Sequence, residues 1–273
     1  MITLVLGSFW YTEKTVDVMK MQDDIMIEIQ NVKEEYQEDA VNAEIKGNTI
    51  IPGLHGEVVD ESKSYQKMKS IGMFDENLLA YTKVDPDVSL KNHKNKFILQ
   101  GNETKKMVSL LFLIEKDTKV EEVKDILSIL DEKQKEGTFF IDGNFLEQNK
   151  EFMLTLRNYE LGNLSYDQNY QSTSFLWLDA ILKNLSNTKE GYCFFEEEKI
   201  DDVSVCVNNH NYSILVNSII SKDPFLTVKK DLHAGQFFAF SISSSLKTEL
   251  PLILDYIYSK GYTIENLKTH LEE

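Results

Sequence analysis

Polar residues that could do chemistry follow two neighbouring elements just past the middle of the chain. The apolar run from Thr138 to Ile141 predicts a short strand, and the Asp-Gly-Asn sequence at 142–144 is a turn signal. Apolar residues then recur at helical spacing, and a second short strand is predicted around Leu161. In such a β-α-β unit the carboxyl ends of the strands face one crevice. We therefore expect Asp142 and the loop 163–168 to lie together at a ligand-binding edge.

The same unit has a distinctive residue order. It carries Thr-Phe-Phe-x-x-Gly-Asn at 138–144, a helical segment, and Glu-x-Gly-Asn-x-Ser at 160–165. This order resembles the polysaccharide deacetylase family, also called the NodB homology domain or carbohydrate esterase family 4. Two histidines of the family's second motif bind a catalytic divalent metal. At the corresponding positions this chain has Leu164 and Gln168.

The other motifs implied by the resemblance are also substituted. The family ends its first strand with two aspartates, a general base and a metal ligand, where this chain has Leu113 and Ile114. A late histidine, the family's general acid, corresponds to Ser241. Zinc in proteins is bound by carboxylate, imidazole or thiolate groups, which these side chains lack. The resemblance thus implies no catalytic residue, metal or cofactor, where an active member would use a divalent metal such as zinc. No histidine occupies a family position (His55, His93, His210, His233, His270).

Acidic residues near the same strand ends allow two interpretations. Glu115, Asp117, Asp142 and Asp167 could together bind calcium or magnesium through carboxylate oxygens. Alternatively they are solvated loop acids in an acidic chain, which is the interpretation we favour. The side chains expected to line a remnant groove are Asp142, Asn163, Ser165, Tyr166 and Asp167.

Cys193 and Cys206 are the only cysteines. They form no Cys-x-x-Cys pair, which argues against a zinc ribbon or a thioredoxin-type site. They could form one disulfide in an extracytoplasmic protein, or remain two separately buried thiols. The sequence leaves both alternatives open.

Composition excludes some classes of partner. The chain of 273 residues has 45 acidic and 29 basic residues, which gives a formal charge of −16. This balance argues against nucleic acid as a partner and against electrostatic adhesion to anionic lipid. With 42% hydrophobic residues, the chain can bury a sizeable core.

The hydrophobic pattern predicts an α/β protein. Strands are expected at 107–114, 192–195, 213–220 and 236–242, and helices at 120–132, 174–185 and 248–260. Alternation on this scale implies parallel strands with helices outside them. Together with the resemblance, it predicts a deacetylase-like distorted (β/α) barrel with a small α+β N-terminal flanking region. That flank, which includes a strand expected at 41–51, resembles the N-terminal extension of some Gram-positive family members.

The N-terminal sequence indicates attachment to a membrane. The apolar run from Met1 to Tyr11 is too short to span a bilayer and lacks the features of a signal peptide. We interpret it as the end of a truncated membrane anchor, although a buried strand is an alternative. The polar segment that follows predicts a helical stalk. The expected organisation is an anchor and stalk over 1–38, the flanking region over 39–104 and the deacetylase-like domain over 105–273.

These observations predict a catalytically inactive polysaccharide deacetylase-like protein. We expect it to be extracytoplasmic, in the bacterial cell envelope and membrane-tethered through its N-terminus only. Its expected role is a glycan-binding or protein-interaction module, with cell-wall glycan or an envelope protein as partner. One alternative is an active polysaccharide or peptidoglycan N-deacetylase, a hydrolase, with a non-standard site. A second is a structural assembly module whose groove is filled by apolar side chains.

Overall fold

The computed structural model describes residues 23–273, which form two compact units. The smaller unit consists of residues 23–41 and 54–87, and the larger of residues 42–53 and 88–273. Segments 42–53 and 88–104, which the sequence places in the flanking region, thus belong to the larger unit. The domain boundaries at 38 and 104 and the membrane anchor stay predictions, and the run from Met1 to Tyr11 lies outside the described residues.

The smaller unit combines short helices with one antiparallel pair of strands. Met26 and Ile29 of the first helix are buried in one cluster with Tyr65 and Met68 of the second. The described part of the predicted stalk is therefore a packed helix. None of the helices within 23–273 has the length and apolar content that crossing a bilayer requires. The elements are α2 (Asp24–Val32), η1 (Lys33–Glu35), β3 (Gly56–Val59), α3 (Glu61–Lys69), η2 (Glu76–Leu78) and β4 (Tyr81–Val84).

A curled sheet is the centre of the larger unit. Its strands are β1 (Glu44–Lys46), β2 (Thr49–Ile51), β5 (Phe97–Ile98), β6 (Met107–Ile114), β7 (Thr138–Ile141), β8 (Glu160–Asn163), β9 (Gly191–Phe195), β10 (Asn211–Leu215), β11 (Ile219–Ile220), β12 (Phe237–Ser241) and β13 (Thr263–Ile264). They follow the order β1-β2-β5-β10-β9-β8-β7-β6-β12-β11, with β13 beside β6. Only β1 and β2 pair antiparallel. Because β1 and β11 end the path unpaired with each other, the sheet is an open, distorted barrel.

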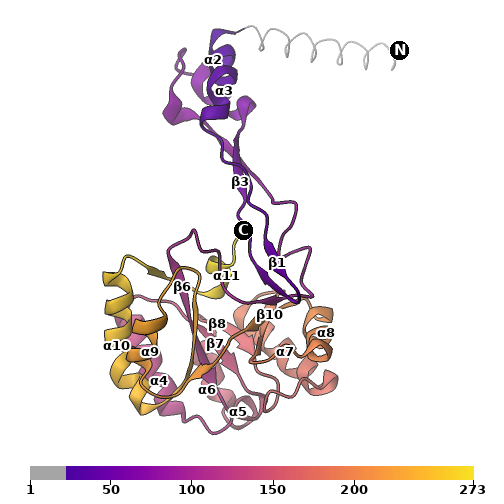
Figure 1. Ribbon diagram of the computed structural model, residues 1–273, viewed down its shortest axis with the longest axis vertical. Coiled ribbons are helices and arrows are strands. Elements are labelled where there is room, and N and C mark those ends of the chain that lie inside the picture. The colour runs from indigo at the N-terminus through magenta and orange to yellow at the C-terminus, as the bar shows by residue number, and fades with distance from the viewer. Residues whose placement is uncertain (1–22) are drawn as a thin grey trace. The chain divides into compact units, whose positions relative to one another are not determined.

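Helices alternate with the parallel strands, because each parallel connection needs a crossover. They are α4 (Val120–Lys133), α5 (Gly143–Gln148), α6 (Lys150–Met153), η3 (Leu154–Leu156), α7 (Ser172–Ser186), α8 (Ile200–Asn208), α9 (Pro224–Asp231), α10 (Ser244–Ser259) and α11 (Leu267–His270). In Figure 1, α4, α9 and α10 gather on one flank of this sheet and α7 and α8 on the other. The predicted α/β barrel-like fold is confirmed.

Strand β6 shows why its sequence is a continuous apolar run. Phe112 and Ile114 pack under the helices, where Phe112 stacks on Phe139 with ring centroids 5.1 Å apart. Leu111 and Leu113 point to the opposite, concave face of the sheet. A strand buried on both faces needs apolar residues at every position.

Two strand predictions were wrong in extent. The strand expected at 41–51 is a hairpin of β1 and β2, because the chain turns at Gly47, whose φ of +59° favours glycine. The strand expected at 213–220 is two strands, β10 and β11, which lie on different parts of the sheet. The polar residues Asn217 and Ser218 lie in the break between them. Local apolar content did not reveal either break.

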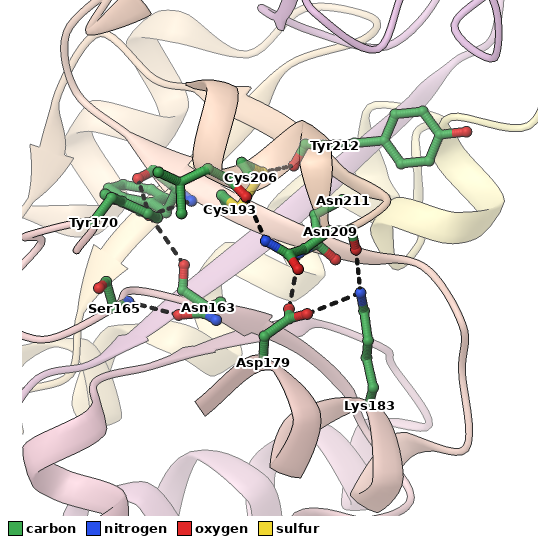
Figure 2. Close-up of a disulfide and its surroundings, with 12 residues drawn as sticks. Asn163, Ser165, Tyr170, Asp179, Lys183, Cys193, Cys206, Asn209, Asn211 and Tyr212 are labelled. Atoms are coloured by element: carbon green, nitrogen blue, oxygen red, sulfur yellow. Dashed lines mark hydrogen bonds and ion pairs between the residues drawn. A yellow bond between two sulfur atoms is a disulfide. The ribbon is translucent and has the colours of Figure 1, made fainter. Parts of the chain in front are cut away.

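Cys193 of β9 and Cys206 of α8 form a disulfide (Figure 2). Their Cα atoms lie 6.2 Å apart, and both residues are fully buried. The bond closes the β9–α8 connection beneath a small apolar cluster that includes Phe175 and Phe195. Of the two alternatives left open by the sequence, the structure contains the disulfide.

A polar network joins α7 to the strands next to this disulfide (Figure 2). Asp179 accepts a hydrogen bond from Asn211 Nδ2 at 2.8 Å and pairs with Lys183 Nζ at 2.9 Å. The buried hydroxyl of Tyr170 donates to the carbonyl of Phe194 at 2.6 Å and accepts from its amide at 3.0 Å. These contacts fix the ends of β8, β9 and β10 relative to one another.

Removing the disulfide should lower the stability of the larger unit. A cross-link that closes a loop of this length contributes about 2–4 kcal/mol by restricting the unfolded chain. We expect the variant Cys193→Ala/Cys206→Ala to lose about this much in urea unfolding, and dithiothreitol to destabilise the wild type similarly. Two titratable thiols in non-reduced, denatured wild-type protein would contradict the bond.

Candidate functional site

The carboxyl ends of four parallel strands bring distant sequence positions together. Leu113 of β6 lies in register with Ser241 of β12 and with Phe140 of β7. Ile141 of β7 is in turn the register partner of Asn163 of β8. The positions that the resemblance assigns to catalysis therefore meet at one edge of the sheet.

A pocket of about 420 Å³ opens at this edge. Its walls come from the loop after β6, the first turn of α4, the end of β7 and the loop after β8. Acidic side chains dominate its lining, with one lysine among them. The lining residues that carry the argument are Glu115, Lys116, Asp117, Glu122, Asp142, Leu164, Asp167 and Gln168.

Asp142 is committed to the backbone of this site. It is the N-cap of α5, and its Oδ1 accepts a hydrogen bond from the amide of Asn144 at 2.7 Å. Its Oδ2 accepts from the amide of Asp167, also at 2.7 Å. The side chain is only 3% exposed. This carboxylate thus joins the turn after β7 to the loop after β8.

The loop after β8 is a tight turn with an unusual backbone. Ser165, Asp167 and Gln168 all have positive φ, at 58°, 49° and 56°. Non-glycine residues rarely adopt this region, so surrounding contacts must stabilise it. Asn163 Oδ1 accepts from the amide of Ser165 at 2.7 Å, and the Ser165 hydroxyl donates to the carbonyl of Asn169. Both side chains are buried and brace the turn.

The remaining predicted groove residues have different positions. Asp167 reaches the pocket and pairs with Lys116 at 2.9 Å. Tyr166 lies in the loop wall with its ring centroid 6.4 Å from that of Trp177, and its hydroxyl donates to Glu147 at 2.7 Å. Burial and this hydrogen bond raise the tyrosine pKa. Of the five residues expected to line the groove, Asp142 and Asp167 face the pocket.

The family's catalytic positions divide between the core and the pocket. Leu113 lies in the concave core and Ile114 in the layer under the helices. Leu164 and Gln168 line the pocket, and Gln168 Nε2 donates to Glu196 Oε1 at 3.2 Å. Leucine and isoleucine have no lone pair to offer, so these side chains do not fit the divalent metal that the resemblance implies. Within residues 23–273, no three His, Cys, Asp or Glu side chains are placed to bind a metal ion.

Like charges crowd the pocket around Glu115. Partial burial raises the pKa of this carboxyl, and the negative charges of Glu196, Asp142 and Asp117 raise it further. A hydrogen bond from Ser241 opposes the increase. The sequence pattern groups Glu115 with Asp117, Asp142 and Asp167, but it gives no signal for Lys116 or for Glu196, which follows β9. Only the strand order, which the sequence does not display, could have placed Glu196 here.

His270 is the one deeply buried histidine in the described chain. Ser109 Oγ donates to the carbonyl of Glu265 at 2.8 Å, so the His270 Nδ1–H donates to Ser109 Oγ, also at 2.8 Å. His270 Nε2 has no hydrogen-bond partner. Burial, with a smaller effect of Lys105, lowers the histidine pKa from 6.5 to about 4. His270 is buried in the core and is not one of the residues that line the pocket.

A sequence relative of the chain is the uncharacterized protein YlxY of Bacillus subtilis, 35% identical over 179 residues. The aligned region covers 64% of this chain and 55% of YlxY, so it spans about half of that protein. No protein-family model matches the chain.

Solved structures of family 4 carbohydrate esterases (CE4) share this fold. A mutant of BA3943, a CE4 family pseudoenzyme from Bacillus anthracis, matches with a TM-score of 0.70 at 23% identity, over 92% of this chain and 98% of that chain. The family 4 carbohydrate esterase PdaA of Bacillus subtilis matches with a TM-score of 0.54 at 13% identity, over 85% and 97%. The chain therefore has the CE4 deacetylase-like fold.

Replacing Asp142 by Asn should destabilise the site. Asn144 and Asp167 would have to share one carbonyl oxygen, or one amide would face an NH₂ group. Leaving a buried donor unsatisfied costs about 1–3 kcal/mol, which urea unfolding can measure. Asp117→Asn, an exposed acid of the same pocket, is the control and should change stability by less than about 0.5 kcal/mol. Equal effects of the two substitutions would contradict the bridging role.

His270 should make the protein less stable in mild acid. Because its folded pKa lies below its unfolded value, the unfolded chain binds more protons between pH 6.5 and about 4. Stability contributed by neutral His270 is thus present above pH 6.5 and is lost as pH falls, by at most about 1.4 kcal/mol per pH unit. Urea unfolding of His270→Gln should show a shallower pH dependence than wild type, whereas exposed His233→Gln should not. Parallel curves for all three proteins would exclude this effect.

Proposed function

We propose that this chain, which has the CE4 deacetylase-like fold, is a catalytically inactive protein of the bacterial cell envelope that binds glycan in its strand-end pocket. The observation that carries the proposal is that the side chains of Leu164 and Gln168 are poor metal ligands or none. Both line the pocket at positions where the resembled family has metal-binding histidines. Without such ligands no metal lowers the pKa of a bound water, and hydrolysis lacks its nucleophile. The likeness to BA3943, described as a pseudoenzyme, supports the same conclusion.

The pocket supports a binding role over a filled groove. Leu113 and Leu164 pack in the core, yet a space of about 420 Å³ with a polar lining remains above them. Asp142 is occupied by backbone amides and Asp167 by Lys116. Glu115, Asp117 and Glu122 then remain as acceptors. A saccharide with hydroxyls and a positively charged amine, such as a de-N-acetylated glycan, suits this chemistry.

The disulfide supports the proposed location. Disulfides form and persist in oxidising, extracytoplasmic environments and are rare in the reducing cytosol. The bond between Cys193 and Cys206 is buried and closes a loop of the larger unit. A membrane tether remains part of the proposal, resting on the apolar N-terminal sequence.

The proposal predicts binding without hydrolysis. Protein purified without chelators and reloaded with Zn²⁺, Co²⁺ or Mn²⁺ should release no acetate from tetra-N-acetylchitotetraose and retain no stoichiometric metal. Chitotetraose, its amine-bearing counterpart, should bind in calorimetry. Glu122→Gln should weaken this binding about twofold to fivefold, the magnitude of a partly exposed ion pair.

Glu121→Gln is the matched control, because Glu121 precedes Glu122 on α4 but does not line the pocket. It should leave the affinity unchanged. Acetate release with tightly bound metal would instead establish an active deacetylase with a non-standard site. Absence of chitotetraose binding would refute the glycan-binding role and favour a structural assembly module.

A further inference from the structure

A second groove lies at the opposite, amino ends of the strands. It consists of two pockets of about 550 and 360 Å³, which share Asn158, Tyr159, Glu160 and Asn266 in their linings. The starts of β8, β9 and β10, the end of α7 and the segment before α11 form its walls. We call it the amino-end groove.

Tyrosine rings form one wall of the amino-end groove. Tyr192 of β9 and Tyr212 of β10 lie side by side in register, with ring centroids 6.2 Å apart. Tyr159 adds a third ring, whose hydroxyl donates to Asp131. Tyrosines present an apolar face and a polar edge, which matches the alternating C–H and hydroxyl surfaces of a sugar ring.

Four carboxylates line the groove, and each has a partner. Asp131 accepts a hydrogen bond from the Tyr159 hydroxyl, and Glu136 accepts one from the Asn266 side-chain amide. Glu160 accepts hydrogen bonds from the amides of Leu267 at 2.7 Å and Lys268 at 2.9 Å. Glu190 is paired with Lys94, whose Nζ lies 4.5 Å from the ring centroid of Tyr212. Neither Glu160 nor Glu190 therefore needs an incoming cation as a partner.

The basic groups of the groove, in contrast, have no such contacts. Among residues 23–273, no hydrogen bond or ion pair involves the guanidinium of Arg157 or the ammonium groups of Lys189 and Lys268. Arg157 is the only arginine of the chain. The chain has a formal charge of −16, yet these three cations, which have no ion-pair partner in the described part of the chain, line one hollow. They would attract a negatively charged group.

Uncharged donors accompany these cations. In the described chain, the side-chain amides of Asn158 and Asn187 and the hydroxyl of Tyr192 make no hydrogen bond within the protein. Burial raises the pKa of Tyr192 well above its ordinary value, and Glu160, Tyr212 and Glu190 raise it further. The hydroxyl therefore stays protonated and able to donate to a ligand.

We infer that the amino-end groove binds a saccharide that carries an acidic group. Tyr192 and Tyr212 would pack against sugar rings, Asn158 and Asn187 would bind hydroxyls, and Arg157 with its neighbouring lysines would bind the acid. An acidic peptide fits less well, because Leu161 is the one aliphatic side chain that lines the larger of the two pockets. The site is distinct from the acidic pocket at the carboxyl ends of the strands.

Tetragalacturonate is a suitable probe, with maltotetraose as its uncharged counterpart and tetraglutamate as an anion without sugar rings. In calorimetry at low salt we expect tetragalacturonate to bind, and maltotetraose and tetraglutamate to bind at least tenfold more weakly. Arg157→Gln should weaken tetragalacturonate about tenfold, as expected for loss of a charge-assisted hydrogen bond. Tyr192→Phe, which removes only the hydroxyl, should weaken it about threefold to tenfold.

Lys150→Gln is the charge-matched control, because Lys150 is exposed on α6 and does not line the groove. It should retain wild-type affinity for tetragalacturonate. Equal binding of tetraglutamate would show a simple charge effect and overturn the proposal. Absence of tetragalacturonate binding at 10 mM, or binding unaffected by both Arg157→Gln and Tyr192→Phe, would overturn it as well.

Discussion

The carboxylate of Asp142 organises the strand-end site. Its two oxygens accept hydrogen bonds from the backbone amides of Asn144 and Asp167. One side chain therefore determines both the start of α5 and the path of the loop after β8. That loop contains three non-glycine residues with positive φ, a conformation that requires such external support. The positions of Leu164 and Gln168 in the pocket depend on this connection. Both oxygens of this carboxylate thus hold the backbone of the site in place.

The two ends of the same parallel sheet have opposite chemistry. At the carboxyl ends, carboxylates crowd one pocket and raise the pKa of Glu115. At the amino ends, Glu160 and Glu190 have partners, whereas Arg157, Lys189 and Lys268 have no side-chain partner among residues 23–273. A curled sheet separates its two ends by the full length of the strands, so each can recognise a different ligand.

Much of the fold could be predicted because its signals are local. The continuous apolar run of β6 and the helical spacing in α4 are readable from short windows, and both elements were predicted within a residue of their ends. The break between β10 and β11 was missed, because the residues on both sides of it are apolar. Nothing in this local pattern indicates that β10 pairs with β5 and β9 whereas β11 pairs with β12. The strand-end site was predicted through Asp142 and Asp167. Asn163 and Ser165 hydrogen-bond to the backbone of the turn, and the sequence does not reveal this, because a polar loop residue can serve the backbone as well as a ligand.

The sequence by itself determined which chemical groups exist: an acidic chain, a single arginine, two cysteines, and apolar residues where the resembled family binds metal. Tertiary structure alone decided which of those groups meet. It joined Cys193 to Cys206, brought Glu196 beside Glu115, and turned Ile114 away from the pocket while leaving Leu164 at its lining. It also aligned Tyr192 and Tyr212 beside Arg157 at the amino ends of the strands. The physical reason is that parallel pairing and register join residues far apart in the chain, and no local pattern encodes those partners.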